Sequence, residues 1–587
     1  MNCLNKVFLD PRKPLVNEVV AWLLGDGRFE GKSESVDGAT SLSHIMVVVP
    51  TAQSGRNLRL ALARRGGVLL PPKVVLPMQL VKPAAPAFRE ASDAEVAAAF
   101  LKFLEGRPRR QAVQTPRGVE TVLAEWRHLF RPEVIGDMGA RLSLLDQLSD
   151  IWRILAGGGM VMADVLASDA AREVLDAAAG EEVARWEELA ALEQAFFAFL
   201  HARGICHPAE NMRLAKTKPR PIDPGIREVV LPALADPIRV LKDVLSAQRP
   251  ELKVTVLLHA DEKDAAKFDA FGRPLVEQWT GKNQPALTRL DTTDIIRGAD
   301  TADMARRVVA DFPAVEDGRE RPSLALVDDE AFPEVSGAFL NAGYVVHNPE
   351  CHPLSISSLG RLVRVLFDLY RPDAAGYAWT SFAAALRSDD VLKALVAEGG
   401  FRRADVLKGI DVVQNRFLPQ HFPVDGVLPD VAVSKYDQPG FAAFSGAAKR
   451  FIDWLDAARA GRPLTAFLRQ MLRRVFARRR LSGRAGEDEF REAAACLWTA
   501  LDALESEAIA AMGLSDAAFG AVVRRQLDAA VYSLEPEALD AVKTEGWLEL
   551  PWSAARRFAL VGFHEGAVPD SLVGHPFAPT PCARRWA

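Results

Sequence analysis

The fold is decided by the stretch HIMVVVPTAQSGRNLRLALARR, which covers residues 44–65. Its segment Ile45–Val49 is an uninterrupted apolar run in which most residues are β-branched, and this pattern predicts a buried strand. Pro50 and Thr51 end the strand, and the residues that follow predict a helix. Because a strand that is apolar on both faces suits a parallel sheet covered by helices, the stretch predicts an α/β fold.

Other short apolar runs bounded by turn residues recur along the chain, and long stretches with helical periodicity separate them. The predicted strands are Lys6–Leu9, Glu228–Leu231, Lys253–Leu258, Leu324–Val327, Tyr344–His347 and Phe558–Gly562. The bias toward Ala, Leu, Arg and Glu favours helices between them. The sequence therefore predicts a helix-rich α/β protein with parallel sheets.

Two long helical stretches interrupt the strand groups. The stretch from about Ala91 to Arg213 is predicted to be almost wholly helical, and the second runs from about Ser355 to Val531 with a loop near residues 420–440. One face of the first carries apolar residues at three- and four-residue steps, namely Trp186, Leu189, Leu192, Phe196 and Leu200. Because strands precede and follow each stretch, each is expected to leave a sheet and return to it.

These positions predict two sheet domains, each with a large helical insertion. We expect the first domain at residues 1–90 and 222–300, with its insertion at 91–221. We expect a second, incomplete domain at residues 301–354 and 532–587, with its insertion at 355–531.

Length, charge and cysteine use limit the class of protein. A chain of 587 residues is too long for a single core. The net charge is −5, so any nucleic-acid contact has to come from a local basic surface. The five cysteines form no C-x-x-C pair, the chain begins without a signal-peptide pattern, and no run of 18 apolar residues occurs. We expect a cytoplasmic protein that has no membrane contact, disulfide or bound metal.

The sequence offers one phosphate-loop candidate, Gly31-Lys32-Ser33. A phosphate loop needs a glycine five residues earlier, a strand before it and a helix after it, so that backbone N–H groups can hold phosphate. Asp26 occupies the position of that glycine, and a polar, turn-rich stretch follows Ser33. We interpret the segment as a surface loop and expect no nucleotide or other cofactor.

Two acidic clusters resemble metal-binding sets. Asp328-Asp329-Glu330 follows a predicted strand, as a magnesium-holding carboxylate pair does in a helicase, but without a phosphate loop the metal would have no triphosphate to bridge. Asp261-Glu262-Lys263 has the residue types of a metal-dependent nuclease, but neighbouring carboxylates on one turn cannot converge on a metal. We interpret the first cluster as a capped strand-to-helix turn and the second as a solvated turn, and we assign no catalytic residue.

Three segments resemble a known family. IMVVVPTAQSGRNLRLALARRGGVLLP, residues 45–71, resembles the strand and helix that follow the phosphate loop of superfamily I DNA helicases, and resembles still more the N-terminal region of the B subunit of AddAB-type helicase–nucleases. HADEKDAAKFDAFGRPLVEQW, residues 259–279, resembles the end of the first RecA-like domain in that subunit. GWLELPWSAARRFALVGFHEGAVPDSLVGHPF, residues 546–577, resembles the strand and loop of its second RecA-like domain.

The resemblance implies two RecA-like domains, each with a helical insertion, in a subunit that assists the repair of DNA double-strand breaks. In the family this half often has a degenerate ATP site and acts as a scaffold and DNA-strand reader beside an AddA-type motor subunit. Members normally continue into a RecB-like nuclease domain, whereas this chain ends at Ala587 with APTPCARRWA. We therefore expect a truncated gene product, which the downstream DNA sequence would test. The cysteines that hold an iron–sulfur cluster in some members have no counterpart here.

DNA contact requires local positive charge, because phosphate contacts dominate affinity. The densest basic run is predicted to lie on a helix with Leu468, Leu472 and Phe476, and it comprises Arg469, Arg473, Arg474, Arg478, Arg479, Arg480 and Arg484. From this run we select Arg473, Arg474 and Arg478 as candidate phosphate-binding residues. A simply solvated helix face explains the run equally well.

Thr51 and Arg56 are further candidates, because Thr51 matches a threonine that touches single-stranded DNA in superfamily I helicases. A helix cap for Thr51 and a surface charge for Arg56 are the alternative interpretation, and we favour it. No basic residues interleave with Trp547 and Trp552, so both tryptophans are predicted to pack in the core.

Three functions stay open at this point. The first is a non-catalytic helicase-like scaffold that guides one DNA strand. The second is an active DNA-dependent ATPase with an unrecognised nucleotide site. The third is a helix-rich interaction protein, or an inert remnant, that does not bind DNA.

Overall fold

The chain folds as a helix-rich α/β protein in which 55% of the residues are helical and the larger sheets are parallel. The computed structural model describes residues 4–36, 39–65, 67–105, 107, 110–115, 118–123, 126, 128–129, 136–168, 181–234, 236–280, 295–312, 323–348, 352–427, 433–481, 487–534, 541–555 and 557–564. These residues belong to two compact units. Unit 1 comprises Met1–Ala91, Phe103–Pro349 and Pro536–Ala587, and unit 2 comprises Ser92–Lys102 and Glu350–Glu535.

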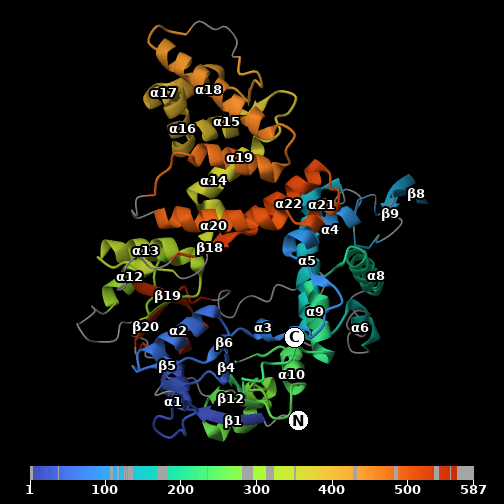
Figure 1. Cartoon of the computed structure of the whole chain (residues 1–587), viewed down its shortest axis with the longest axis vertical. Coiled ribbons are helices and arrows are strands. Elements are labelled where there is room, and N and C mark those ends of the chain that lie inside the picture. Colours follow the sequence, from blue (N-terminus) through green and yellow to red (C-terminus); the bar gives the residue numbers. More distant parts are fainter. Residues whose placement is uncertain are drawn as a thin grey trace. The chain divides into compact units, whose positions relative to one another are not determined.

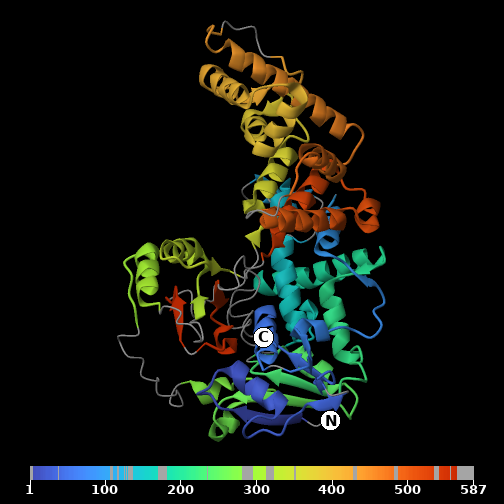
Figure 2. The same cartoon turned by 60° about the vertical axis from the view of Figure 1, so that its left-hand side comes forward.

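Unit 1 contains a five-stranded parallel sheet built from two distant parts of the sequence (Figures 1 and 2). Its strands, in spatial order, are β1 (Leu4–Leu9), β12 (Lys253–His259), β11 (Glu228–Pro232), β4 (Ile45–Val48) and β6 (Lys73–Val75). Apolar residues of helix α1 (Leu15–Leu24) pack with β4 and with helix α2 (Ala52–Ala63) in one buried cluster. The β-branched run that predicted β4 is fully buried, as expected for a strand covered on both faces.

A second parallel sheet of four strands lies in the same unit. Its strands, in spatial order, are β14 (Val346–His347), β19 (Val542–Gly546), β13 (Ser323–Leu326) and β20 (Phe558–Val561). Helices α12 (Thr301–Asp311) and α13 (Phe332–Asn341) pack on it through Val308, Val335 and Phe339. Gly562 follows β20 with a φ of 81°, a conformation that only glycine adopts without strain, and it lies against Asp328. All seven strands predicted from the sequence are thus confirmed, while β6 of the first sheet and β19 of the second were not predicted.

The remaining elements of unit 1 are mostly helical. They are β2 (Glu34–Val36), β3 (Ala39–Ser41), β5 (Leu69–Leu70), α3 (Pro77–Leu80), β7 (Arg89–Glu90), β8 (Arg110–Thr115), β9 (Gly118–Leu123), α5 (Met138–Gly157), α6 (Met162–Ala167), α8 (Glu181–His201), β10 (Ile205–Cys206), α9 (Pro208–Thr217), α10 (Arg239–Ser246), η2 (Glu262–Lys267), α11 (Val276–Trp279), η5 (Asp329–Ala331) and η7 (Leu550–Trp552). The predicted apolar face of α8 is confirmed, because all five of its residues are fully buried.

The prediction that residues 91–213 are almost wholly helical is wrong at the short strand β10 and, over a longer stretch, at β8 and β9. Strands β8 and β9 pair as an antiparallel hairpin over six residue pairs. Their sequences, RQAVQT and GVETVL, carry five β-branched residues, namely Val113, Thr115, Val119, Thr121 and Val122. β-branched residues favour strands over helices.

Trp552 joins the two sheet regions of unit 1. It follows β19 in the sequence, yet it packs in the core of the first sheet, where only 2% of its surface is exposed. Trp547, five residues earlier, is 44% exposed, so its predicted burial is wrong. The two tryptophans differ because η7 turns Trp552 toward α1 and α2.

Glu545 forms a polar contact between the same two regions. It is buried on β19, and Asn57 of α2 donates a hydrogen bond to its Oε1 over 3.1 Å. Burial raises the pKa of Glu545 to about 7, assisted by the nearby Glu549, while Asn57, Lys543 and Ser323 act in the opposite direction.

The free energy of unfolding should therefore depend on pH through Glu545. Its pKa is raised above the ordinary 4.5, so the folded state holds this proton over a range in which the unfolded state releases it. Its contribution is complete below pH 4.5 and is lost as pH rises through about 7, for a total of roughly 3 kcal/mol. Denaturant unfolding of wild type and Glu545→Gln between pH 4.5 and 8 measures it. Equal pH slopes for the two proteins would contradict this assignment.

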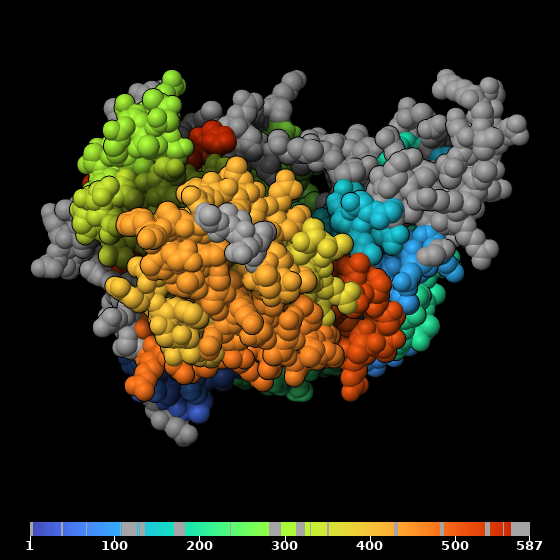
Figure 3. Space-filling view, turned by 90° about the horizontal axis from the view of Figure 1, so that it is seen from above, coloured from blue at the N-terminus to red at the C-terminus, as the bar shows by residue number. Residues whose placement is uncertain are grey.

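Unit 2 is built from helices with short strand pairs. Its elements are α4 (Asp93–Phe103, up to Lys102), β15 (His352–Pro353), η6 (Leu354–Ile356), α14 (Ser358–Asp368), β16 (Tyr377–Ala378), α15 (Trp379–Arg387), α16 (Asp389–Gly399), α17 (Arg403–Phe417), β17 (His421–Phe422), α18 (Gln438–Arg459), α19 (Leu464–Phe476), α20 (Glu487–Leu504), α21 (Glu507–Ala511), α22 (Asp516–Ala529) and β18 (Val531–Tyr532). Helices α16 to α19 form the yellow and orange surface in Figure 3. Gly409 of α17 and Gly440 of α18 are in such close contact that a Cβ at Gly409 would clash with the Gly440 carbonyl.

In the described part of the chain, no helix combines the length and the apolar character that crossing a lipid bilayer requires.

Candidate nucleic-acid interface

A basic hollow lies on unit 2 between α18 and α19. It has a volume of about 450 Å³ and is lined by Gly446, Lys449, Arg450, Asp453, Trp454 and Arg474. Five of these residues share one face of α18, since their spacing of three, one, three and one residues follows the helical repeat. Arg474 comes from the last turn of α19, which packs against α18. The lining thus contains three cations, Lys449, Arg450 and Arg474, and one carboxylate, Asp453. This excess of positive charge favours an anionic partner.

The end of helix α16 holds the two arginines of this basic hollow in place. Arg474 forms an ion pair with Glu398 over 3.2 Å, and Arg450 donates a hydrogen bond to the Glu398 carbonyl oxygen over 3.0 Å. Positive charge at a helix C-terminus is stabilising, because the last carbonyls carry partial negative charge. Each guanidinium has five N–H donors, so both arginines keep donors for a further acceptor. Lys449 is exposed and forms no hydrogen bond or ion pair within the part of the chain that the structure describes.

Trp454 forms the floor of the basic hollow. Its ring is 2% exposed and lies under the Arg474 guanidinium, whose central carbon is 4.7 Å from the ring centroid. The indole Nε1 is buried and finds no hydrogen-bond acceptor among the described residues. A buried donor without a partner is unusual in folded proteins. The ring fixes the position of Arg474 by cation–π attraction.

The predicted arginines have different environments. Arg474 lines the basic hollow, and Arg478 lies near it, with Nη1 3.4 Å from the Ala397 carbonyl oxygen of α16. Arg473 is exposed on α19 but does not line the hollow. Arg469 is mostly buried between Asp502 and Glu505, so it belongs to the internal packing of unit 2.

The basic run does not lie on one helix as predicted. Helix α19 ends at Phe476, so Arg474 and Arg478 do not form a stripe along it. The last buried apolar residue of the helix is Val475, and Leu481 is 48% exposed. Beyond Phe476 the chain therefore has no apolar face that packing could stabilise as helix. Arg484 lies outside the described residues.

Thr51 and Arg56 lie in unit 1, at the start of α2. Thr51 is the N-cap, and its Oγ1 accepts a hydrogen bond from the Ser54 backbone N–H over 3.1 Å. The helix-cap interpretation of Thr51 is confirmed. Arg56 is exposed and donates to Gln53 Oε1 over 3.1 Å, as a surface charge does.

The Gly31-Lys32-Ser33 segment lacks the geometry of a phosphate loop. Ser33 leads directly into strand β2 and not into a helix. The Lys32 ammonium lies 5.3 Å from the centroid of the Trp22 ring. The prediction of a surface loop without a following helix is confirmed.

Both acidic clusters lie at the start of short 3-10 helices. The predicted turn from strand to helix at Asp328 is confirmed, whereas Asp261-Glu262-Lys263, predicted as a solvated turn, leads into the six-residue η2. Asp328 Oδ1 accepts a hydrogen bond from the Glu330 backbone N–H over 2.9 Å, which caps the turn from β13 into α13. Asp261 pairs with Lys263 over 3.2 Å at the surface. Within the described ranges, no group of three or more His, Cys, Asp or Glu side chains is placed to hold a metal ion.

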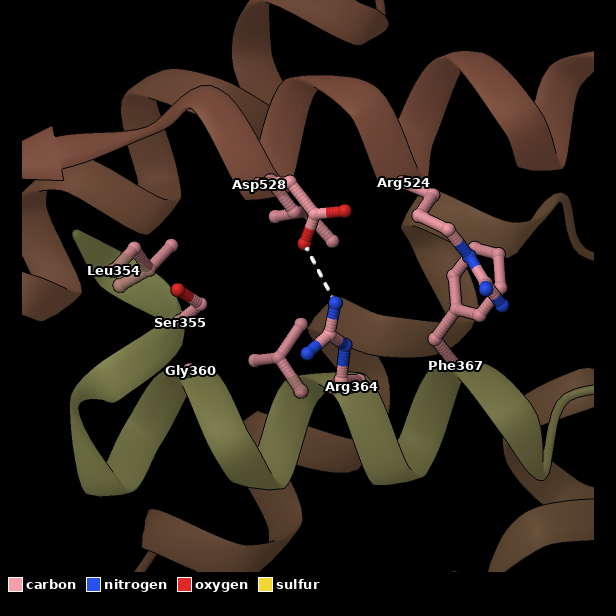
Figure 4. Close-up of a pocket in the computed structure, with 9 residues that line it drawn as sticks. Leu354, Ser355, Gly360, Arg364, Phe367, Arg524 and Asp528 are labelled. Carbon is pink, nitrogen blue, oxygen red and sulfur yellow. Dashed lines mark hydrogen bonds and ion pairs between the residues drawn. The ribbon is translucent and has the colours of Figure 1, made fainter. Parts of the chain in front are cut away.

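A smaller pocket lies between α14 and α22 of unit 2 (Figure 4). Arg364 and Asp528 form an ion pair across it over 3.1 Å, and Arg524 stacks on Phe367 with 4.8 Å to the ring centroid. Its volume of about 30 Å³ has room for one water molecule only. We interpret it as a packing defect between two helices.

Lys449 and Arg450 were missed by the sequence reasoning. A signal was present, because the two residues lie side by side on the polar face of a long amphipathic helix. A pair of adjacent cations is common on helix surfaces, so their role becomes visible only when α19 brings Arg474 to them.

No family model matches the sequence, and no curated protein matches it either.

Proposed function

We propose that the chain is a non-catalytic, helicase-like scaffold that guides one DNA strand beside an AddA-type helicase–nuclease subunit in the processing of DNA double-strand breaks. The basic hollow of unit 2 carries this proposal, because it gathers three cations above a buried tryptophan on a chain whose net charge is negative. Local positive charge of this kind is what contact with a phosphate backbone requires.

Two further features support the proposal. Each parallel sheet takes strands from before and after a long helical segment, which is the organisation expected of two RecA-like domains with insertions. The Gly31-Lys32-Ser33 segment leads into a strand, which agrees with a chain that does not hydrolyse ATP. Residues 562–569, part of the segment 546–577 that resembles the second RecA-like domain, support the proposed family through their sequence alone, since residues 565–569 lie outside the described part of the chain.

Binding of a fluorescent tailed duplex at several salt concentrations tests the proposal. The logarithm of the association constant should fall linearly with the logarithm of the salt concentration, by about 0.7 to 0.9 per phosphate contact. An inert protein would show no binding and no slope. DNA-stimulated ATP hydrolysis that disappears in Lys32→Ala would refute the non-catalytic assignment in favour of an active ATPase.

Glu398→Gln should tighten DNA binding about two- to fivefold, because the carboxylate competes with phosphate for Arg474. The amide keeps the size of the side chain but loses the charge. Asp411→Asn is the matched control, since Asp411 pairs with Arg387 over 2.8 Å and does not line the basic hollow. Fluorescence anisotropy with the same duplex measures both variants. An equal gain in both would show a general charge effect and would contradict a role for Arg474.

A further inference from the structure

A second hollow of unit 1 lies between the two sheet regions and was not singled out by any sequence motif. It has a volume of about 350 Å³, within the range of small-molecule sites. Helix α2 contributes Asn57, Leu60 and Ala61, and Arg64 caps its C-terminal end. Strand β19 contributes Val542, Lys543 and Glu545. The rest of the wall is formed by Val16, Ser323, Ala541, Trp552 and the three residues after Trp552.

One polar atom of this inter-sheet hollow lacks a partner. Glu545 is 8% exposed, and its Oε2 is buried without a hydrogen-bond donor among the described residues. The Ser323 hydroxyl lies near enough to lower the pKa of Glu545, but it makes no hydrogen bond of normal geometry to Oε2. A buried acceptor that has lost water without gaining a donor is costly and calls for an explanation. A ligand with an N–H group would supply the missing donor.

The neighbouring Asn57 is fixed from two sides. Its Oδ1 accepts a hydrogen bond from Gln53 Nε2 over 3.3 Å, and its Nδ2 donates to Glu545 Oε1 over 3.1 Å. The amide therefore holds the carboxyl group in one orientation before any ligand arrives, and such preorganisation favours binding.

Two cations lie on the same wall. Arg64 follows the end of α2 and Lys543 lies on β19, and both side chains are exposed. The structure gives neither an ion-pair partner in the residues it describes. The charged groups around Glu545 are Lys543 and Glu549 from its own segment and Arg64 from α2. Glu545 Oε2 can thus accept a hydrogen bond from an N–H group of a ligand, and Arg64 and Lys543 can bind a negatively charged group of the same ligand.

We propose that the inter-sheet hollow binds a nucleoside monophosphate, with an amino group of the base donating to Glu545 Oε2 and the phosphate binding Arg64 and Lys543. The volume favours this ligand over a free amino acid, which offers the same pairing of an N–H donor with an anion but fills less of the space. The site requires no phosphate loop, because it holds a monophosphate through side chains. It is independent of DNA binding by unit 2.

Calorimetric titration of the full chain at pH 8 tests the proposal, with AMP, GMP, CMP and inorganic phosphate as separate probes. We expect one equivalent of at least one nucleotide to bind, at least tenfold more tightly than phosphate. Arg64→Ala with Lys543→Ala should weaken binding at least tenfold. Arg59→Ala with Lys73→Ala removes the same charge from α2 and β6 outside the inter-sheet hollow and should leave binding unchanged.

Comparison of pH 8 with pH 6 tests the part played by Glu545. The amino group of the base donates to the ionised form of Glu545, whose pKa of about 7 leaves it mostly ionised at pH 8 and mostly protonated at pH 6. Wild type should therefore bind the nucleotide about tenfold more weakly at pH 6 than at pH 8. Glu545→Gln should bind weakly and lose that difference, apart from the titration of the phosphate itself, which affects both proteins equally.

Several results would overturn the proposal. The first is that folded protein, with an unchanged melting temperature, binds no nucleotide at millimolar concentration. The second is that the two double variants lose nucleotide affinity equally. The third is that amino acids bind as tightly as nucleotides. Failure here would leave the DNA-guiding function of unit 2 intact, because that function is measured with tailed duplex and with variants of other residues.

Discussion

Replacing Lys449, Arg450 and Arg474 with alanine should lower the affinity of the chain for a tailed duplex on the order of a hundredfold at ~50 mM salt. The three cations line one basic hollow, so a single DNA backbone passing over it would contact all of them. With each phosphate contact that is lost, binding also releases fewer counterions from the DNA. The slope of log affinity against log salt should therefore become shallower by about 2 to 3.

The control for this experiment removes equal charge elsewhere in unit 2. Arg371, Arg387 and Arg491 pair with Asp516, Asp411 and Asp488, and none of them lines the basic hollow. Their joint replacement by alanine should change the slope by less than about 1. Arg450→Lys with Arg474→Lys keeps the charge and should retain most of the affinity. A control variant as weak as the hollow variant would contradict a local interface.

Trp552→Ala should destabilise unit 1 by about 3–5 kcal/mol, the usual result of removing a large aromatic side chain from a core. The ring is 2% exposed among apolar residues of α1 and β4, so its loss leaves a cavity in the core of the first sheet. Because η7 follows β19, the same change detaches the second sheet region from the first. Hydrogen-exchange protection of the α1 and β4 amides measures the effect.

Trp547→Ala is the matched control. The two tryptophans lie five residues apart, but Trp547 is 44% exposed. Its replacement should change stability by less than about 0.5 kcal/mol. Similar losses in both variants would show that Trp552 does not hold the core together.

Sequence alone determined most of the strands of both sheets. Strands such as β4 and β11 are apolar on both faces, because helices cover both sides of a parallel sheet. Their continuous runs of β-branched residues therefore predict that they are buried. The helical face of α8 was readable for the same reason, since apolar residues repeat with the period of the helix. The cap formed by Thr51 depends only on its own turn and was also predictable.

Strand β19 escaped prediction because its sequence, VKTEG, carries polar residues. Glu545 looks like a surface residue in the sequence, and only pairing with β13 and contact with α2 bury it. Trp547 and Trp552 are indistinguishable in the sequence, and the turn at η7 decides which of them is buried.

The candidate interface was likewise predictable from the sequence only in part. The arginine-rich segment was visible in the sequence, but only Arg474 of the three predicted arginines lines the basic hollow. Its partners Lys449 and Arg450 lie on another helix, and the packing of α18 against α19 brings them together. Local periodicity thus determined the strands, helix faces and caps, because these depend on near neighbours. The tertiary structure alone decided which charges share a site, because that depends on contacts between residues far apart in the chain.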